Sequence, residues 1–271
     1  MNCVLKYPGA KNRLASWICG YIPEHKVYLE PFAGSLAVLF NKERCHIETV
    51  NDLNGEIVNF FRVLRDNPEE LKRLIELTPY SREEYDLSYE AADNDIERAR
   101  RYCVRCWQGF GCANVYHNGF KNGQQTKSPN PARAWSELPE TVKLAAERLK
   151  GVQIENLPAI ELIKRYDTKD VFIYADPPYL LSTRKNHLYK HEMTDADHVE
   201  LLEALLHHPG KVLISGYDNE LYNSMLEGWY KAQTRTLAEG GLHRTETLWM
   251  NYKAGYRQME LGHILGGIED E

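Results

Sequence analysis

The 271-residue chain has no long hydrophobic run. No apolar stretch approaches the roughly 18 to 20 residues that cross a bilayer, and the first residues lack the apolar core of a signal peptide. With 43% hydrophobic and 27% charged residues, the composition suits one large α/β domain or one domain that carries an insertion. We therefore expect a soluble cytoplasmic protein that has no membrane partner.

Cysteine is scarce and irregularly spaced, with six residues scattered along the chain. This pattern argues against a disulfide framework and favours reduced thiols. Cys103 and Cys106 form a C-x-x-C pair that could join Cys112 and His117 in a zinc site. The continuous helix predicted over residues 98–107 would instead place both thiols on one apolar face, so we expect no metal.

Acidic residues are absent from Arg98 to Ser136, although the chain as a whole has a formal charge of -6. This segment holds seven basic residues interleaved with aromatic, amide and glycine residues. The mixture suits contact with phosphates and the reading of base edges. The alternative is a solvated basic loop held beside an acidic body by charge attraction. The candidates for nucleic-acid contact are Arg105, Asn114, Asn118, Lys121, Lys127 and Arg133.

Short apolar segments alternate with amphipathic helical patterns on either side of a central region without strand signals. Strands are predicted over residues 27–30, 46–51, 152–156, 171–175, 211–215, 230–237 and 245–252. Helices are predicted over residues 11–21, from about 35, and over 53–65, 140–150, 158–165, 194–208 and 219–226. The pattern predicts an α/β fold with a seven-stranded, mostly parallel sheet and a C-terminal β-hairpin. Residues 1–66 and 139–271 would form the main domain, and residues 67–138 an inserted, mainly helical domain.

A tight turn, Glu30-Pro31-Phe32-Ala33-Gly34-Ser35, follows the first predicted strand. A turn at this position lets backbone amides approach a ligand. Asp52 follows the second strand, where a carboxylate can bind a ribose diol as in dinucleotide folds. The turn is not G-x-G-x-x-G, which leaves a pyrophosphate without its usual cradle. The predicted ligand is therefore a nucleoside without a diphosphate.

The tetrapeptide Asp176-Pro177-Pro178-Tyr179 directly follows the apolar strand predicted over residues 171–175. Ligands bind at this edge in open α/β sheets, and the two prolines leave the turn few conformations. The Asp176 carboxylate and the Pro177 carbonyl could accept the two hydrogens of an exocyclic base amine and so release its lone pair. Tyr179 could stack on the base. The alternative is a plain proline turn with a capping aspartate.

Lys6-Tyr7-Pro8-Gly9-Ala10-Lys11 precedes these segments and completes an ordered series. The series resembles the N6-adenine DNA methyltransferases of the Dam-like, D12 class. Their order is Tyr/Trp-x-Gly-x-Lys, Glu-Pro-Phe-x-Gly, a ribose-binding Asp, a target-recognition insertion and Asp-Pro-Pro-Tyr. The resemblance spans Lys6 to Tyr179 and extends weakly through residues 245–252. Leu36 departs from it, because a second small residue often stands there, and Ser215-Gly216-Tyr217-Asp218 departs at the fifth strand.

The resemblance implies a Rossmann-like methyltransferase sheet, S-adenosylmethionine as methyl donor and a flipped-out adenine in double-stranded DNA as target. It assigns the reaction to Asp176, Pro177 and Tyr179. It assigns cofactor binding to Tyr7, Pro8, Gly9, Lys11, Glu30, Phe32, Gly34, Asp52, Asn156 and Asp176. We expect a monomer without an obligate protein partner.

Two other functions remain open on the sequence. The same turn can serve any planar exocyclic amine, so the substrate could be RNA adenine or the N4 amine of DNA cytosine. The chain could also be a DNA-binding regulator that has lost turnover. His187, His191, Asp195 and His198 could suggest a metal site, but we expect surface residues or a mobile flap over the target base.

Overall fold

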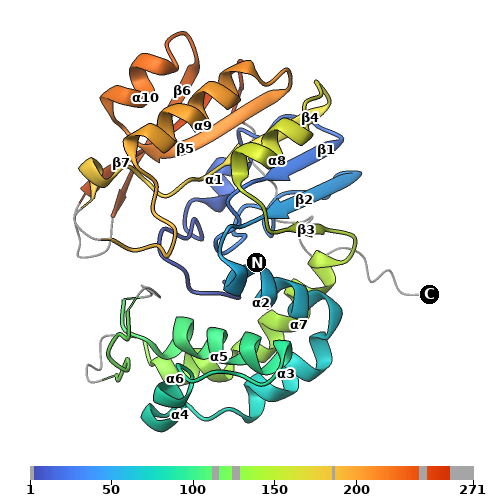
Figure 1. Ribbon diagram of the computed structural model, residues 1–271, viewed down its shortest axis with the longest axis vertical. Helices are drawn as coiled ribbons and strands as arrows, with labels where there is room; N and C mark the ends of the chain where they lie inside the picture. Colours follow the sequence, from blue (N-terminus) through green and yellow to red (C-terminus); the bar gives the residue numbers. More distant parts are fainter. Residues whose placement is uncertain (1–2, 112–115, 124–128, 185–186, 238–242, 257–271) are drawn as a thin grey trace.

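A seven-stranded sheet forms the upper part of the computed structural model, and a mainly helical region lies below it (Figure 1). The structure describes residues 3–111, 116–123, 129–184, 187–237 and 243–256. The strands are β1 (Val27–Glu30), β2 (Ile47–Asn51), β3 (Gln153–Glu155), β4 (Val171–Ala175), β5 (Lys211–Tyr217), β6 (Tyr230–Leu237) and β7 (His243–Met250).

The strand order across the sheet is β3-β2-β1-β4-β5-β7-β6. Neighbouring strands from β3 to β5 pair in parallel, whereas β7 runs antiparallel to both β5 and β6. The mostly parallel α/β sheet and the C-terminal hairpin are therefore confirmed. β1 and β4 are neighbours near the centre, so the turns that follow them meet at one edge of the sheet.

Helices cover the sheet and fill the lower region. They are α1 (Ala15–Cys19), α2 (Gly55–Asp66), α3 (Pro68–Leu77), α4 (Arg82–Leu87), α5 (Asp95–Gln108), α6 (Pro131–Ser136), α7 (Leu138–Leu149), α8 (Ala159–Arg165), α9 (Asp195–His207) and α10 (Glu220–Met225), with a 3₁₀ turn at Leu181–Thr183. The predicted capping box at Thr194 and Asp197 forms and begins α9.

Both faces of β4 are buried, because alternate side chains enter two different clusters. Ile173 packs with the cluster that includes residues of α8 and α9, whereas Phe172 and Tyr174 join the cluster that includes residues of α2, α5 and α7. All five residues of β4 are buried. This explains why the strand reads as a continuous apolar run rather than an alternating one.

Two predicted helices near the N-terminus are wrong, one in its extent and one in its existence. The helix expected over residues 11–21 shortens to α1, and the chain before it forms turns. The helix expected from residue 35 does not form, and residues 37–41 lie in turns. Leu36 has a φ of 55°, in the left-handed region that a right-handed helix excludes.

Residues 67–138 are mainly helical, as predicted, apart from an isolated bridge between Gly109 and Phe120. Side chains of α3 and α5 belong to the same buried cluster as side chains of α2, α7 and the strands. The boundaries of an inserted domain therefore remain a prediction. No helix in the described part of the chain is long and apolar enough to cross a membrane.

The C-x-x-C pair lies inside α5. Cys103 and Cys106 are both fully buried in the apolar cluster, as the helical interpretation expects. Cys112, which a zinc site would need, lies outside the described residues. Within the described ranges there is no group of three His, Cys, Asp or Glu side chains that could hold a metal ion.

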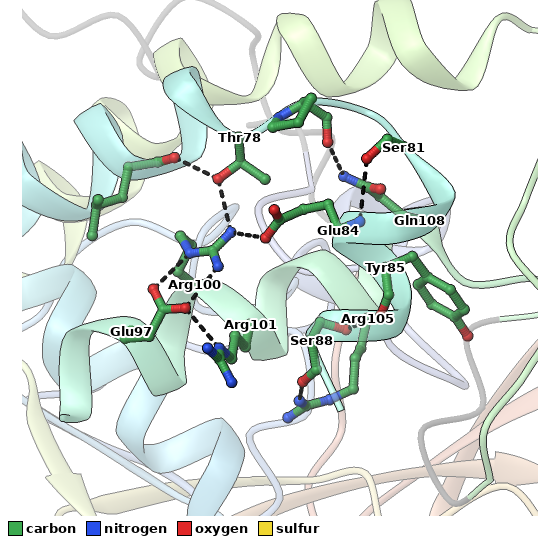
Figure 2. Close-up of polar contacts among 12 residues, drawn as sticks. Thr78, Ser81, Glu84, Tyr85, Ser88, Glu97, Arg100, Arg101, Arg105 and Gln108 are labelled. Carbon is green, nitrogen blue, oxygen red and sulfur yellow. Dashed lines mark hydrogen bonds and ion pairs between the residues drawn. The ribbon is translucent and has the colours of Figure 1, made fainter. Parts of the chain in front are cut away.

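Ion pairs occupy the arginines of α5 (Figure 2). Arg100 donates to the carboxylates of Glu97 and Glu84 and, at 2.9 Å, to the hydroxyl of Thr78. Arg101 donates to Glu97 at 2.6 Å. The arginines in the helical part of the basic segment are thus paired with acidic neighbours. This is the intramolecular charge attraction expected if the segment does not contact DNA.

Replacing Arg100 by Ala should destabilise the protein strongly. The Arg100 side chain is 9% exposed, and its removal leaves the partly buried Glu84 without this cation and Glu97 with Arg101 as its remaining arginine partner. A loss of about 3–5 kcal/mol in the free energy of unfolding is expected, measured by urea denaturation. The exposed pair Arg73–Glu70 supplies the control, since solvent screens this pair and R73A should lose far less stability than the Arg100 variant. Equal losses in the two variants would contradict the role of burial.

Candidate active site

A cavity of about 290 Å³ lies at the carboxyl ends of β1, β2 and β4. The turns after these strands, the segment before α1 and the segment before α9 form its walls. It collects nine of the residues expected from the sequence, namely Tyr7, Pro8, Gly9, Lys11, Glu30, Phe32, Gly34, Asp52 and Asp176. The main site hypothesis therefore converges on one hollow, although its parts come from distant stretches of the chain.

Asp52 ties the turn after β1 to the end of β2. One carboxylate oxygen accepts the backbone N–H of Gly34 at 3.0 Å, and the other accepts the N–H of Asn54 at 2.8 Å. Burial raises the pKa of Asp52 to about 6, and the two N–H groups oppose that rise. Each oxygen keeps a further lone pair for a ligand.

Close packing requires glycine in the turn after β1. Gly34 has a φ of 48°, and a Cβ there would lie 3.3 Å from Cδ1 of Tyr7. Leu36, the departure from the family pattern, is fully buried and belongs to the core rather than to the cavity wall. The larger residue at this position therefore does not narrow the cavity.

Glu30 is a buried acid in the cavity wall, only 2% exposed. It accepts a hydrogen bond from the Tyr28 hydroxyl at 2.7 Å. Burial raises the pKa of Glu30 to about 8, although the Tyr28 hydroxyl acts in the opposite direction. The side chain is therefore mostly protonated at neutral pH.

Asp176 is held through one of its two oxygens. Oδ1 accepts from Lys11 Nζ at 2.8 Å and from the Ser215 hydroxyl at 2.8 Å. Among the residues that the structure describes, no donor is bonded to Oδ2. The two bonds to Oδ1 fix the orientation of the carboxylate. Because Asp176 lines the cavity, its Oδ2 can accept a hydrogen bond from a ligand there.

Lys11 is the buried cation of the site, at 7% exposure. Besides Asp176, its Nζ donates to the Gly9 carbonyl at 2.9 Å and lies 3.9 Å from Oε1 of Glu246. Burial alone would lower the pKa of Lys11, but the two carboxylates outweigh it and hold the pKa above its usual value. Lys11 is thus a permanent positive charge.

Tyr179 and Pro177 stand beside the cavity rather than in its wall. The Tyr179 hydroxyl donates to Glu246, and Lys11 Nζ lies 4.6 Å from the centroid of the ring. The ring meets Tyr217 edge to face, with centroids 4.7 Å apart. Sequence reasoning missed Glu246, because a single acid in a hairpin strand carries no distinctive spacing.

Tyr189 is a second residue that the sequence did not suggest. Its ring lies 5.9 Å from the ring of Tyr7, and a Cβ at Gly9 would collide with its hydroxyl. Glu192 holds this segment by pairing with Arg184 and accepting the N–H of Tyr189 at 3.1 Å. A tyrosine in a polar loop gives no periodic signal, so only the fold shows that it lines the cavity.

Asn156 does not line the cavity. Its side-chain amide donates to the backbone carbonyls of Asp52 at 2.6 Å and Leu53 at 3.3 Å. It therefore supports the segment that carries Asp52.

The expectation that His198 is a surface residue is wrong. His198 is fully buried, and its Nδ1 lies 2.9 Å from the Tyr222 hydroxyl. The reason is its place on α9, where it shares the inward face with Leu201 and Leu202. His191 lines the cavity, and His187 is exposed.

The candidates for nucleic-acid contact differ in what the structure says of them. Arg105 donates to the Ser88 carbonyl and lies 3.3 Å from Glu56, whereas the Arg133 side chain is 81% exposed. The backbone carbonyls of Asn118 and Lys121 each accept a tyrosine hydroxyl at 2.6 Å, which fixes this loop. Asn114 and Lys127 lie outside the described residues.

Comparison with known families places the chain beside DNA methyltransferases. The model of the D12 class N6 adenine-specific DNA methyltransferase family matches residues 7–238. A 30% identity over 188 residues relates the chain to "Type II methyltransferase M1.LlaDCHI" of Lactococcus lactis subsp. cremoris, covering 65% of this chain and 64% of that protein. The chain thus spans a little less than two thirds of that relative.

Two further relatives have similar names. "Type II methyltransferase M.MjaIII" of Methanocaldococcus jannaschii is 25% identical over 260 residues, which cover 83% of this chain and 88% of that protein. A "DNA adenine methylase" of Vibrio cholerae is 26% identical over 188 residues, 67% of each chain.

The stability of the Glu30→Gln variant relative to the wild type should rise with pH. The folded pKa of Glu30 is about 8 and its ordinary value is 4.5. Below 4.5 the acid is protonated in both the folded and the unfolded protein, so burial of its charge costs nothing. The cost grows as the pH rises to 8 and is constant above it, and Gln never ionises. Between low pH and pH 8, the unfolding free energy of the variant should therefore rise by about 3–5 kcal/mol relative to that of the wild type.

Urea denaturation from pH 4 to pH 9 measures this difference. Glu24→Gln is the matched control, because Glu24 is exposed, and its difference from the wild type should stay flat. A flat profile for Glu30→Gln would show that Glu30 is not a buried neutral acid.

Proposed function

The chain belongs to the D12 class N6 adenine-specific DNA methyltransferase family, and on that premise we propose that it is a site-specific DNA adenine N6-methyltransferase. The proposed methyl donor is S-adenosylmethionine, and the proposed target is an adenine flipped out of double-stranded DNA. The observation that carries the proposal is the meeting of three motifs, which contribute Lys11, Asp52 and Asp176, around one cavity.

The donor set of the cavity suits this cofactor. Asp52 would accept the ribose hydroxyls with its remaining lone pairs. Phe32 and Ile160 offer apolar walls for a planar ring, and the Asp176 carboxylate suits a cationic ligand. S-adenosylmethionine, when bound, supplies an electrophilic methyl group on a positively charged sulfur.

Asp176 and Pro177 would prepare the target amine. The exocyclic nitrogen is a poor nucleophile because its lone pair is delocalised into the base. Oδ2 of Asp176 and the Pro177 carbonyl would accept its two hydrogens and favour a pyramidal nitrogen. Lys11 and Ser215 fix the carboxylate through Oδ1, so that no reorientation is needed during the reaction.

The proton of the amine also finds its acceptor at Asp176. The nitrogen would gain positive charge beside the carboxylate as it takes the methyl group and the carbon–sulfur bond of the donor breaks, with the bonding electron pair left on sulfur. Oδ2 of Asp176 would then accept the surplus proton. Tyr179 would stack on the base and hold its plane. We assign these roles to Asp176, Pro177 and Tyr179, with Tyr7, Pro8, Gly9, Lys11, Glu30, Phe32, Gly34 and Asp52 around the cofactor.

The partner and the setting follow from the same premise. Double-stranded DNA is the proposed partner, and exposed Arg133 and half-buried Lys121 are proposed to contact it. A cytoplasmic monomer is proposed, because one chain carries the whole motif series. RNA adenine, the N4 amine of cytosine and a regulator without turnover are the alternatives that the assay below distinguishes.

Methyl transfer from labelled S-adenosylmethionine to separate DNA and RNA samples tests the proposal. Nucleoside analysis should recover the label as N6-methyladenine from DNA alone. Label in RNA, or in N4-methylcytosine, would replace the proposed substrate. Cofactor binding by calorimetry without transfer to any DNA would favour the regulator.

Asp176→Ala should lower kcat by about 100-fold or more, because it removes an acceptor used in the transition state. Asp170→Ala is the matched control, since Asp170 is an exposed acid just before the same strand. It should keep normal turnover. Near-normal methylation by Asp176→Ala would contradict the mechanism.

Cofactor affinity should fall as the pH drops below about 6, the pKa of Asp52. A ribose hydroxyl donates to the ionised carboxylate, so each pH unit below the pKa should weaken binding by up to about tenfold. Asp52→Asn should bind the cofactor weakly at every pH, and its affinity should not fall further below pH 6. Calorimetric titration from pH 5 to pH 8 measures the cofactor affinity of both proteins. If the variant shows the same fall in affinity below pH 6 as the wild type, Asp52 is not the group that causes it.

A further inference from the structure

Glu246 reaches the site because β7 is antiparallel. The parallel strands bring their carboxyl ends to the edge where Asp176 lies, but β7 brings its first residues to that edge. Its register with β5 pairs Glu246 with Tyr217, the last residue of β5. A strand of this direction thus adds a carboxylate to the site from the far end of the sequence.

The carboxylate of Glu246 contacts two residues of the site. Its carboxylate accepts the hydroxyl of Tyr179, and the same oxygen lies 3.9 Å from Lys11 Nζ. Lys11 in turn contacts Asp176 at 2.8 Å. Glu246 therefore touches the tyrosine of the Asp-Pro-Pro-Tyr turn directly and its aspartate through one shared cation.

The burial of Glu246 needs an explanation beyond packing. The residue is 2% exposed, and a buried carboxylate is unfavourable unless it is paired and hydrogen-bonded. Its cationic neighbour among the described residues is Lys11, already paired more closely with Asp176. An apolar residue at this position would be buried at a lower cost in free energy. A buried acid beside the reactive turn therefore indicates a functional role.

The orientation of Tyr179 depends on this acid. Lys11 lies over the ring, and Tyr217 meets it edge to face, but neither contact is directional enough to hold the hydroxyl end of the side chain at one point. The hydroxyl is the one directional handle on a tyrosine side chain. The hydrogen bond to Glu246 on β7 fixes the position of this hydroxyl.

We propose that Glu246 is a positioning residue that fixes the Tyr179 ring in the plane on which the flipped target base stacks. The inference rests on the proposed function and deepens it. Without the bond, the ring samples other orientations, the extrahelical base loses its platform, and the flipped state becomes less populated. The cofactor cavity, which Glu246 does not line, keeps its affinity.

A fluorescent base tests the proposal. Wild-type protein first identifies the methylated adenine in unmodified DNA, and a duplex with 2-aminopurine at that position then reports base flipping as a rise in fluorescence. Glu246→Ala should lower the rise at least about fivefold and raise the KM for DNA by a similar factor. The KM for the cofactor should stay within about twofold of the wild type.

The conservative variant and a double-mutant cycle separate positioning from folding. Glu246→Gln should recover most of the fluorescence rise, because its amide oxygen still accepts the Tyr179 hydroxyl. Tyr179→Phe should lose as much as Glu246→Ala, and the double variant should lose no more than either, since all three break the same bond. Tyr252→Phe is the control, because it removes a partly buried hydroxyl that donates to the Tyr21 carbonyl at 3.0 Å, away from the site.

Three outcomes would overturn the inference alone while the wild type still methylates DNA. These are a normal fluorescence rise in Glu246→Ala, a loss in Glu246→Gln as large as in Glu246→Ala, and additive losses in the double variant. A wild type that transfers no methyl group to DNA would overturn the proposed function and this inference together.

Discussion

The ion pair between Lys11 and Asp176 is the interaction on which the site depends. It joins a segment near the N-terminus to the residue that follows the central strand β4. The two charged atoms lie 2.8 Å apart, and both side chains are largely buried. Ser215 from β5 and Glu246 from β7 complete the same cluster. Removing the cation would leave two carboxylates close together without a positive charge between them, so the position of the reactive turn rests on one side chain.

The acids of the site differ because their surroundings differ. Asp52 accepts two backbone N–H groups, which partly offset burial and leave its pKa at about 6. Glu30 has the hydroxyl of Tyr28 as a partner, and burial raises its pKa to about 8. Asp176 has a cation and a hydroxyl on a single oxygen. One cavity therefore offers an anion for hydroxyl groups, a neutral acid, and an oriented acceptor for an amine.

The sequence predicted the elements where local chemistry was decisive. β4 and β6 have the predicted limits, and the capping box of α9 forms, because apolar runs and N-cap residues act over a few residues. It failed where distant contacts were decisive. Leu36 adopts a left-handed conformation at the close turn after β1, and His198 turns inward with the apolar face of its helix. The basic residues of α5 read as a DNA surface until the fold placed Glu56, Glu84 and Glu97 beside them.

The sequence by itself determined the motif series, the mostly parallel α/β sheet with its terminal hairpin, and nine residues of the cavity wall. Each is a property of a short segment, since a turn, a strand or a carboxylate after a strand is written in consecutive residues. Only the tertiary structure decided the strand order, the oxygen by which Asp176 is held, and the presence of Tyr189 and Glu246. These depend on which edges of the sheet meet and in which direction β7 runs, and such long-range pairings leave no local pattern in the chain.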